Sequence, residues 1–168
     1  RDFAKRRFDD EIRAWQWNRA KYQKPKYAAI NDQETATADS RPYLLLPNGN
    51  EHFTTGVLVV HGFLASPAEL RNLGDRLAAR DYAVMGVRLA GHGTSPHELQ
   101  KRPWGDWLAS VRRGYEILSA FCENIIIVGF STGGALSAIL AADRPEKLAG
   151  LVMASTPLKF RNRNLMFV

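Results

Sequence analysis

The sequence contains one cysteine and four histidines among its 168 residues, so it has few side chains for disulfides or metal binding. A single thiol, Cys122, excludes a disulfide framework within the chain and is neutral about the compartment. No two histidines have the spacing of a zinc site, and we predict no bound metal. No secretory signal is visible, which slightly favours the cytoplasm. Because the sequence starts at Arg1 without a methionine, removal of a leader peptide stays an alternative, and the localisation is unknown.

Long uncharged runs are also scarce. The longest, residues 124–142, has about the length of a membrane span. Glycines and hydroxyl side chains occupy its middle, which is typical of a buried strand followed by a buried helix. We therefore predict no transmembrane segment there.

Charge is concentrated near the start of the chain. Residues 1–26 hold nine Lys and Arg against four Asp and Glu, a surplus of five, and the whole chain has a net charge of +6. A basic arm suits nucleic acid or an anionic membrane surface. The simpler interpretation is a solvated helix face. We predict no nucleic-acid partner and keep peripheral membrane contact through residues 1–26 as an alternative.

The pattern of residues 1–40 differs from that of the remaining chain. Large side chains recur three or four residues apart with charges between them, which predicts an amphipathic helix. These side chains are Phe8, Ile12, Trp15, Arg19 and Tyr22. Pro25 breaks the pattern, and the polar stretch 31–40 indicates a linker. We predict an N-terminal extension over residues 1–40, made of this helix and this linker.

From Arg41 onward, short apolar runs alternate with helical patterns. The runs predict strands at 43–46, 57–60, 82–89, 125–128 and 148–154. Between them, Ser66 to Glu69 has the spacing of a capping box, and another helix follows Ser131. A long helix begins near Trp104, and helical spacing predicts one apolar face made of Trp104, Trp107, Val111, Tyr115 and Leu118. Strands that alternate with helices predict a parallel sheet covered on both faces. The class predicted from this order is α/β.

The pentapeptide Gly129-Phe130-Ser131-Thr132-Gly133 matches G-x-S-x-G between a predicted strand and a predicted helix. In a nucleophile elbow the chain turns so sharply there that the serine takes a strained backbone conformation. Small residues are needed two positions before and after it. No lysine follows the glycines, so the pattern of a phosphate-binding loop is absent. We predict that Ser131 is a catalytic nucleophile.

A serine nucleophile also needs donors for the oxyanion of the tetrahedral intermediate. The strand 57–60 runs directly into His61-Gly62-Phe63, and Gly62 allows a turn that presents the Phe63 N–H. The second donor is the N–H of Thr132, at a helix N-terminus. We predict an oxyanion hole formed by Phe63 and Thr132.

Three motifs, at residues 61–63, 88–93 and 129–133, occur in the order and at the spacing found in one group of enzymes. Over about residues 41–157, the chain resembles the carboxylesterases and monoglyceride-lipase-like enzymes of the α/β-hydrolase superfamily. The resemblance implies an α/β-hydrolase fold, with a mostly parallel sheet and helices on both faces. It also implies hydrolysis of small-molecule carboxylic esters without a cofactor.

In that group a cap is inserted after the strand that corresponds to 148–154. The resemblance thus implies that residues 41–157 are the N-terminal part of the hydrolase core and residues 158–168 the start of the cap. The expected fold is truncated before the cap and the C-terminal strands. We also expect an exposed apolar edge at 148–154.

The catalytic triad is incomplete in this sequence. Its order in the fold is Ser, then Asp or Glu, then His, yet no histidine follows Ser131. The acids after it, Asp143 and Glu146, lie at the far end of the following helix and cannot reach the serine. We expect the triad acid and base beyond residue 168, and expect the 168-residue chain alone to be inactive. His61 and His92 precede the serine and are better explained as structural histidines.

Alternative functions remain at this point. A thioesterase, a peptidase or a C–C hydrolase would use the same elbow. A non-catalytic or truncated hydrolase fold that acts by binding would explain the missing histidine. The oligomeric state and the natural substrate are not determined by these motifs.

Overall fold

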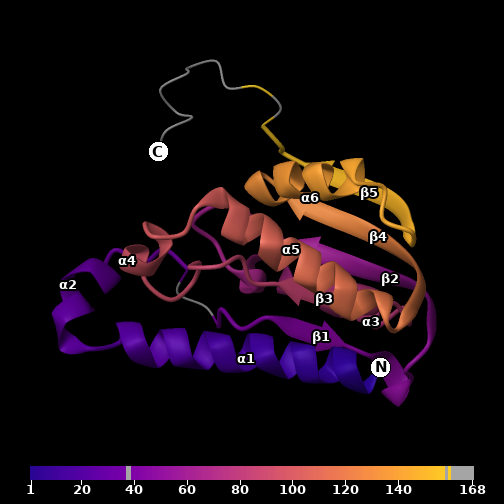
Figure 1. Ribbon diagram of the computed structural model, residues 1–168, viewed down its shortest axis with the longest axis horizontal. Helices are drawn as coiled ribbons and strands as arrows, with labels where there is room; N and C mark the ends of the chain where they lie inside the picture. The colour runs from indigo at the N-terminus through magenta and orange to yellow at the C-terminus, as the bar shows by residue number, and fades with distance from the viewer. Residues whose placement is uncertain (37–38, 158, 160–168) are drawn as a thin grey trace.

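The computed structural model describes residues 1–36, 39–157 and 159, and a five-stranded sheet forms its centre (Figure 1). The strand order is β1-β3-β2-β4-β5, with β1 antiparallel to β3 and the other neighbours parallel. The strands are β1 (Tyr43–Leu45), β2 (Phe53–Val60), β3 (Ala83–Val87), β4 (Cys122–Phe130) and β5 (Leu148–Ala154). Because four strands are parallel, their carboxyl ends lie together, and the segments that follow β2, β3 and β4 all leave the sheet at that end.

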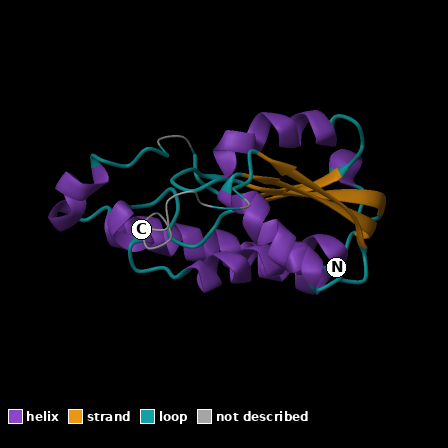
Figure 2. Ribbon diagram, turned by 90° about the horizontal axis from the view of Figure 1, so that it is seen from above, coloured by secondary structure: helices purple, strands orange, loops and turns teal. Residues whose placement is uncertain are grey.

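Helices cover both faces of this sheet (Figure 2). The α-helices are α1 (Asp2–Tyr22), α2 (Ala28–Asn31), α3 (Arg71–Ala78), α4 (Pro96–Leu99), α5 (Trp104–Ser119) and α6 (Thr132–Ala142). Short 3₁₀ helices are η1 (Pro25–Tyr27), η2 (Pro47–Gly49) and η3 (Pro67–Leu70). A mostly parallel sheet between helices confirms the predicted fold class.

Two cores lie on opposite faces of the sheet because successive strand side chains alternate in direction. Leu58 and Val60 join the larger core, which includes Val111 and Leu118 of α5. Val57 and its alternate neighbours on β2 and β3 face the other way and pack with leucines of η3 and α3. Burial on both faces explains why residues 57–60 of β2 form an uninterrupted apolar run rather than an alternating one.

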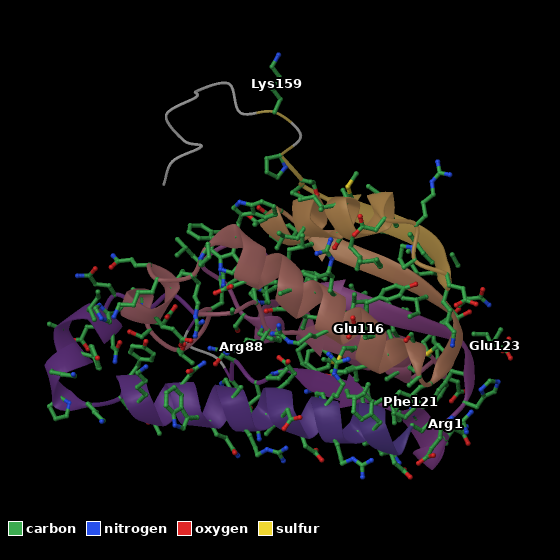
Figure 3. The ribbon with its side chains drawn as sticks, viewed as in Figure 1. Arg1, Arg88, Glu116, Phe121, Glu123 and Lys159 are labelled. Carbon is green, nitrogen blue, oxygen red and sulfur yellow. The ribbon has the colours of Figure 1, made fainter. Side chains whose placement is uncertain are left out.

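The predicted N-terminal helix exists as α1 and packs beside α5 (Figure 1). Trp15 is buried, and its indole N–H donates to the Ser40 hydroxyl at 3.0 Å. Arg7 forms an ion pair of 2.5 Å with Glu116, which lies on α5 on the side facing α1 (Figure 3). The N-terminal segment is therefore attached to the sheet domain along its length. The boundary between an extension and a core stays a prediction.

Some expectations need correction or fall outside the described chain. Trp104, expected on the apolar face of its helix, is 59% exposed because it is the first residue of α5, directly after Pro103. The predicted start of a cap, residues 158–168, lies outside the described residues apart from Lys159. Within the described part of the chain, no helix is both long enough and apolar enough to span a bilayer.

The last strand, β5, forms an edge of the sheet. Its partner on one side is β4, and Val152 and Met153 are 50% and 41% exposed. The exposed apolar edge expected at 148–154 is thus present. Such an edge is normally paired or covered in a native sheet.

Candidate active site

Ser131 lies between β4 and α6, with φ 52° and ψ −120°. A positive φ is uncommon for any residue other than glycine and stores strain. The conformation is held from outside, since the Ser131 N–H donates to the Ala154 carbonyl of β5 at 2.9 Å. The turn therefore lifts the serine out of the strand at the end of the sheet where β2 also ends.

Close packing explains the glycines of this turn. A Cβ on Gly129 would lie 2.6 Å from the Gly133 carbonyl oxygen, and one on Gly133 would collide with the backbone carbonyls of Val60 and His61. Helix α6 thus approaches β2 more closely than any side chain allows. The spacing G-x-S-x-G is a steric requirement of this strand-to-helix turn.

The end of β2 reaches the serine. A Cβ built on Gly62 would be 3.3 Å from the Ser131 Cβ, so the two turns are in contact. Neither the Phe63 N–H nor the Thr132 N–H has an acceptor among the described residues. Thr132 is the first residue of α6, where free N–H groups and the helix dipole favour an anion. Both N–H groups thus have no acceptor within the described residues, and the oxyanion hole that they would form stays a prediction.

Glu69 shapes the turn after β2. Its carboxylate accepts a hydrogen bond from the Gly62 N–H at 3.2 Å. The capping box predicted for Ser66 and Glu69 is therefore not formed. The Ser66 hydroxyl accepts from the Ala68 N–H, the Glu69 N–H donates to the Ser66 carbonyl, and the Glu69 carboxylate points toward the turn after β2. Sequence spacing alone could not separate these two destinations for one carboxylate.

His61 is buried, and both of its ring nitrogens are engaged. Nδ1 lies 2.8 Å from the Gly62 carbonyl oxygen, and Nε2 accepts from the Leu89 N–H at 3.2 Å. Burial, assisted by the neighbouring His92, lowers the pKa of His61 to about 3. The ring joins the end of β2 to the end of β3 as a neutral group. The expectation of a structural histidine agrees with this geometry.

Phe63 is held by an aromatic cluster. Its ring centroid lies 5.8 Å from that of His92 and 5.6 Å from that of Trp107, and the His92 ring also meets that of His61 edge-on. Burial lowers the pKa of His92 to about 4. His92 Nε2 and Trp107 Nε1 are buried without a hydrogen-bond partner within the described residues. The cluster contacts one side of the Phe63 ring, which stays 40% exposed.

Arg88 and Glu98 form a buried ion pair next to this cluster. Arg88 donates from Nε to the His92 carbonyl at 2.9 Å and from Nη2 to the Thr94 hydroxyl at 3.0 Å. Its guanidinium also pairs at 3.5 Å with Glu98, a fully buried carboxylate that Arg102 contacts as well. Figure 3 shows Arg88 in the loop region between the sheet and α4. These contacts fix the loop 88–94 that carries His92.

Comparison with known proteins places this site in a family. The family described as serine aminopeptidase, S33, a group of α/β hydrolases, matches residues 52–167. The chain belongs to this family. The match includes all three motifs and begins after α1. The predicted resemblance to α/β-hydrolase esterases is confirmed.

Two curated proteins are similar to this chain of the S33 family. A thermostable monoacylglycerol lipase of Bacillus sp. (strain H-257) is 39% identical over 102 residues, which cover 61% of this chain and 40% of the lipase. A carboxylesterase of Bacillus subtilis (strain 168) is 36% identical over 112 residues, covering 66% and 45%. The chain therefore spans less than half the length of these relatives.

Solved structures agree with the fold. A structure described with LipS and LipT, two metagenome-derived lipolytic enzymes, has a TM-score of 0.69 and 32% identity, covering 79% of this chain and 52% of that one. A monoacylglycerol lipase of Paleococcus ferrophilus has a TM-score of 0.57 and 23% identity, covering 74% and 47%. At 23% identity, the similarity to the Paleococcus ferrophilus lipase concerns the fold alone.

Other candidates in the S33-family chain lie away from Ser131. Asp143 pairs with Arg112 at 2.7 Å at the far end of α6, as expected for a residue with no part in the triad. His52 is exposed and pairs with Glu123. Within the residues that the structure describes, no three His, Cys, Asp or Glu side chains are close enough to hold a metal ion.

The motifs did not identify Glu69 and Trp107 as parts of this site, and Arg88, although it begins the motif at 88–93, was given no role there. Trp107 was assigned to a helix face, and Glu69 to a helix cap. A signal was available for Arg88, because a charged residue at the end of an apolar strand requires a buried partner. Its partner Glu98 could not be chosen from the other acids by sequence alone.

Proposed function

We propose that this chain is the nucleophile-bearing part of a serine esterase, which cleaves small carboxylic esters through an acyl-enzyme on Ser131. The strained backbone of Ser131, directly before the N-terminus of α6, is the observation that carries the proposal. Relatives named monoacylglycerol lipase and carboxylesterase support ester hydrolysis as the chemistry.

In the proposed reaction, the Ser131 hydroxyl attacks the ester carbonyl and transfers its proton to a histidine base. The N–H groups of Phe63 and Thr132 hold the oxyanion that forms, and each such donor typically contributes about 3–4 kcal/mol to transition-state stabilisation. The alcohol leaves, and water then releases the acyl group from Ser131. Since the two backbone donors are attached to rigid turns, they need no reorganisation during the reaction.

The base and the acid belong to the finer part of the proposal. His61 is excluded as a base, because its two nitrogens are occupied by Gly62 and Leu89 and its pKa is lowered to about 3. No histidine follows Ser131 in the sequence. We place the histidine and its acidic partner in polypeptide that follows residue 168 in the whole protein.

The apolar surface beside the proposed oxyanion hole suits an acyl chain. Phe63 and Leu64 are 40% and 49% exposed although both are large and apolar. Exposed apolar side chains next to a nucleophile can be covered by an acyl chain, by a cap or by both. An aliphatic or aryl ester of modest size is thus the proposed substrate class.

The test is covalent labelling of the whole natural protein with a fluorophosphonate, read by intact mass and peptide mapping. We expect one adduct, on Ser131, and no adduct in Ser131→Ala. Ser119→Ala removes a hydroxyl that hydrogen-bonds to Glu116 and serves as the matched control. A labelled Ser131→Ala variant, or an adduct on another serine, would contradict the assignment.

The competing proposal is a hydrolase fold that acts only by binding. The absence of a histidine after Ser131 is the observation that favours it. Turnover of a short p-nitrophenyl ester by the whole protein, lost in Ser131→Ala, would exclude it. A panel of matched ester, thioester and aminoacyl amide substrates then separates an esterase from a thioesterase or a peptidase.

A further inference from the structure

Acidic and basic side chains are distributed unevenly along residues 1–26. Residues 1–11 contain four basic and four acidic side chains, whereas residues 12–26 contain five basic side chains and no acid. The whole surplus of the segment therefore lies in its second half. These five residues are all exposed: Arg13, Arg19, Lys21, Lys24 and Lys26. We call this group, together with Trp17, the basic patch.

Three charges of the first half pair with other parts of the molecule. Lys5 and Arg7 pair with acids of the loop before β2 and of α5, and Glu11 pairs with Arg113 at 2.6 Å. In the basic patch, within the described residues, Arg13 alone pairs with a carboxylate, the exposed Asp10. Arg19 and Lys26 lie over the rings of Trp15 and Tyr27, contacts that leave their positive charges without a carboxylate partner in the described part of the chain.

The helix geometry places part of the patch directly away from the core. Arg13, Trp17 and Lys21 are each four residues apart and form one row. Trp15 and Tyr22, which are buried, lie on the opposite side of the helix. Trp17 is 63% exposed, and the Lys21 ammonium lies 4.8 Å from its ring centroid. Exposure of the apolar indole surface to water is unfavourable in free energy. A tryptophan flanked by cations is typical of a membrane–water interface.

The patch also has a defined position relative to Ser131. Figure 1 shows that α1 ends, with α2, on the side of the molecule toward which the parallel strands point. Tyr27, beside the patch, packs its ring 5.1 Å from that of His97 on α4, the helix that follows the loop bearing His92. The C-terminal part of the patch, Lys24 and Lys26, therefore lies at the end of the molecule that carries the candidate active site.

We propose that the basic patch docks the protein on an anionic lipid surface, with Trp17 as the interfacial anchor. The attraction comes from lysine and arginine side chains near acidic headgroups, and it weakens as salt is added. The preference for lipid over nucleic acid rests on the proposed esterase function, because lipid esters are found at such surfaces. The binding itself is independent of catalysis.

The experiment is cosedimentation of the whole protein with phosphatidylcholine vesicles that contain or lack phosphatidylglycerol. We expect binding only to the vesicles with phosphatidylglycerol, with loss at high salt. Lys24→Gln/Lys26→Gln should lower the partition coefficient by about tenfold to thirtyfold, from the contribution of each cation near a charged membrane. Trp17→Gln should lower the partition coefficient of the otherwise unchanged protein, and this loss should not depend on the salt concentration.

The matched control is Arg76→Gln/Arg80→Gln, which removes two exposed charges from α3 and its C-terminal end. Equal losses in both double variants would overturn the proposal, because net charge and not the patch would then govern binding. Equal binding to neutral vesicles, or binding to single-stranded RNA in place of vesicles, would overturn it as well. Hydrolysis of a soluble ester by Lys24→Gln/Lys26→Gln should be unchanged. This readout separates a failure of the docking proposal from a failure of the esterase proposal.

Discussion

Two turns meet at the candidate active site, and they are built in different ways. The turn after β4 is shaped by backbone sterics, with glycines at positions where a Cβ would meet carbonyl groups. The turn after β2 is shaped by side chains: Glu69 accepts from the Gly62 N–H, and His92 and Trp107 enclose the Phe63 ring. A backbone turn tolerates almost no substitution, whereas a turn held by side chains can weaken in steps.

This difference has a consequence for function. The turn that carries the nucleophile has a conformation that the local sequence largely dictates. The turn that carries the Phe63 donor depends on residues from four segments of the chain, including the loop 88–94 and α5. Substitutions are therefore expected to disturb the position of the Phe63 N–H before they disturb that of Ser131. The predictions below separate the two turns.

The largest effect is expected for Gly133→Ala. The added methyl would collide with the carbonyls of Val60 and His61, and we expect a loss of about 3 kcal/mol or more in the free energy of unfolding. Urea denaturation of the whole protein measures it. The control is Gly105→Ala, at an open position of α5, where a gain of about 0.5–1 kcal/mol is expected. A neutral Gly133→Ala would show that α6 can move away from β2.

Acidification should weaken the side-chain-built turn. His61 and His92 have folded-state pKa values lowered to about 3 and about 4, from the ordinary value of 6.5. The unfolded chain therefore binds protons first, and stability falls as the pH drops below 6.5. Between pH 6.5 and 5, two such histidines remove about 3 kcal/mol from the free energy of unfolding.

Denaturation curves across this pH range provide the measurement. His61→Gln should reduce the slope of stability against pH. An identical slope in the His61 variant would mean that this histidine does not stay neutral in the folded protein.

The smallest effect is expected for Glu69→Ala. The Gly62 N–H loses its acceptor, so the orientation of the Phe63 N–H becomes less defined, and kcat/KM of the whole protein should fall about tenfold. Glu69→Gln keeps an oxygen acceptor and should retain most of the activity. If both variants fall equally, the negative charge and not the hydrogen bond is what matters at this position.

Much of the fold could be predicted from the pattern of the chain. Apolar runs marked β2, β3 and β4 because the central part of a parallel strand covered on both faces is apolar, and 3.6-residue periodicity marked α1 and α5. An apolar run also marked β5, although its Val152 and Met153 are exposed. The edge strand β1 was expected, but its antiparallel pairing with β3 was not. The exposure of Trp104 was also missed, because periodicity assigns a face and cannot say whether a helix end extends past its neighbours.

The sequence by itself determined the Ser131 turn, since local sterics require glycine at fixed distances from the serine and these distances are visible along one segment. It also determined the excess of positive charge before residue 27. Tertiary structure alone decided that Glu69 turns toward Gly62, that Arg88 selects Glu98, and that α1 lies along α5. Each of these contacts joins segments that compete for the same polar groups or apolar faces, and only the packed fold selects among partners that local sequence leaves equivalent.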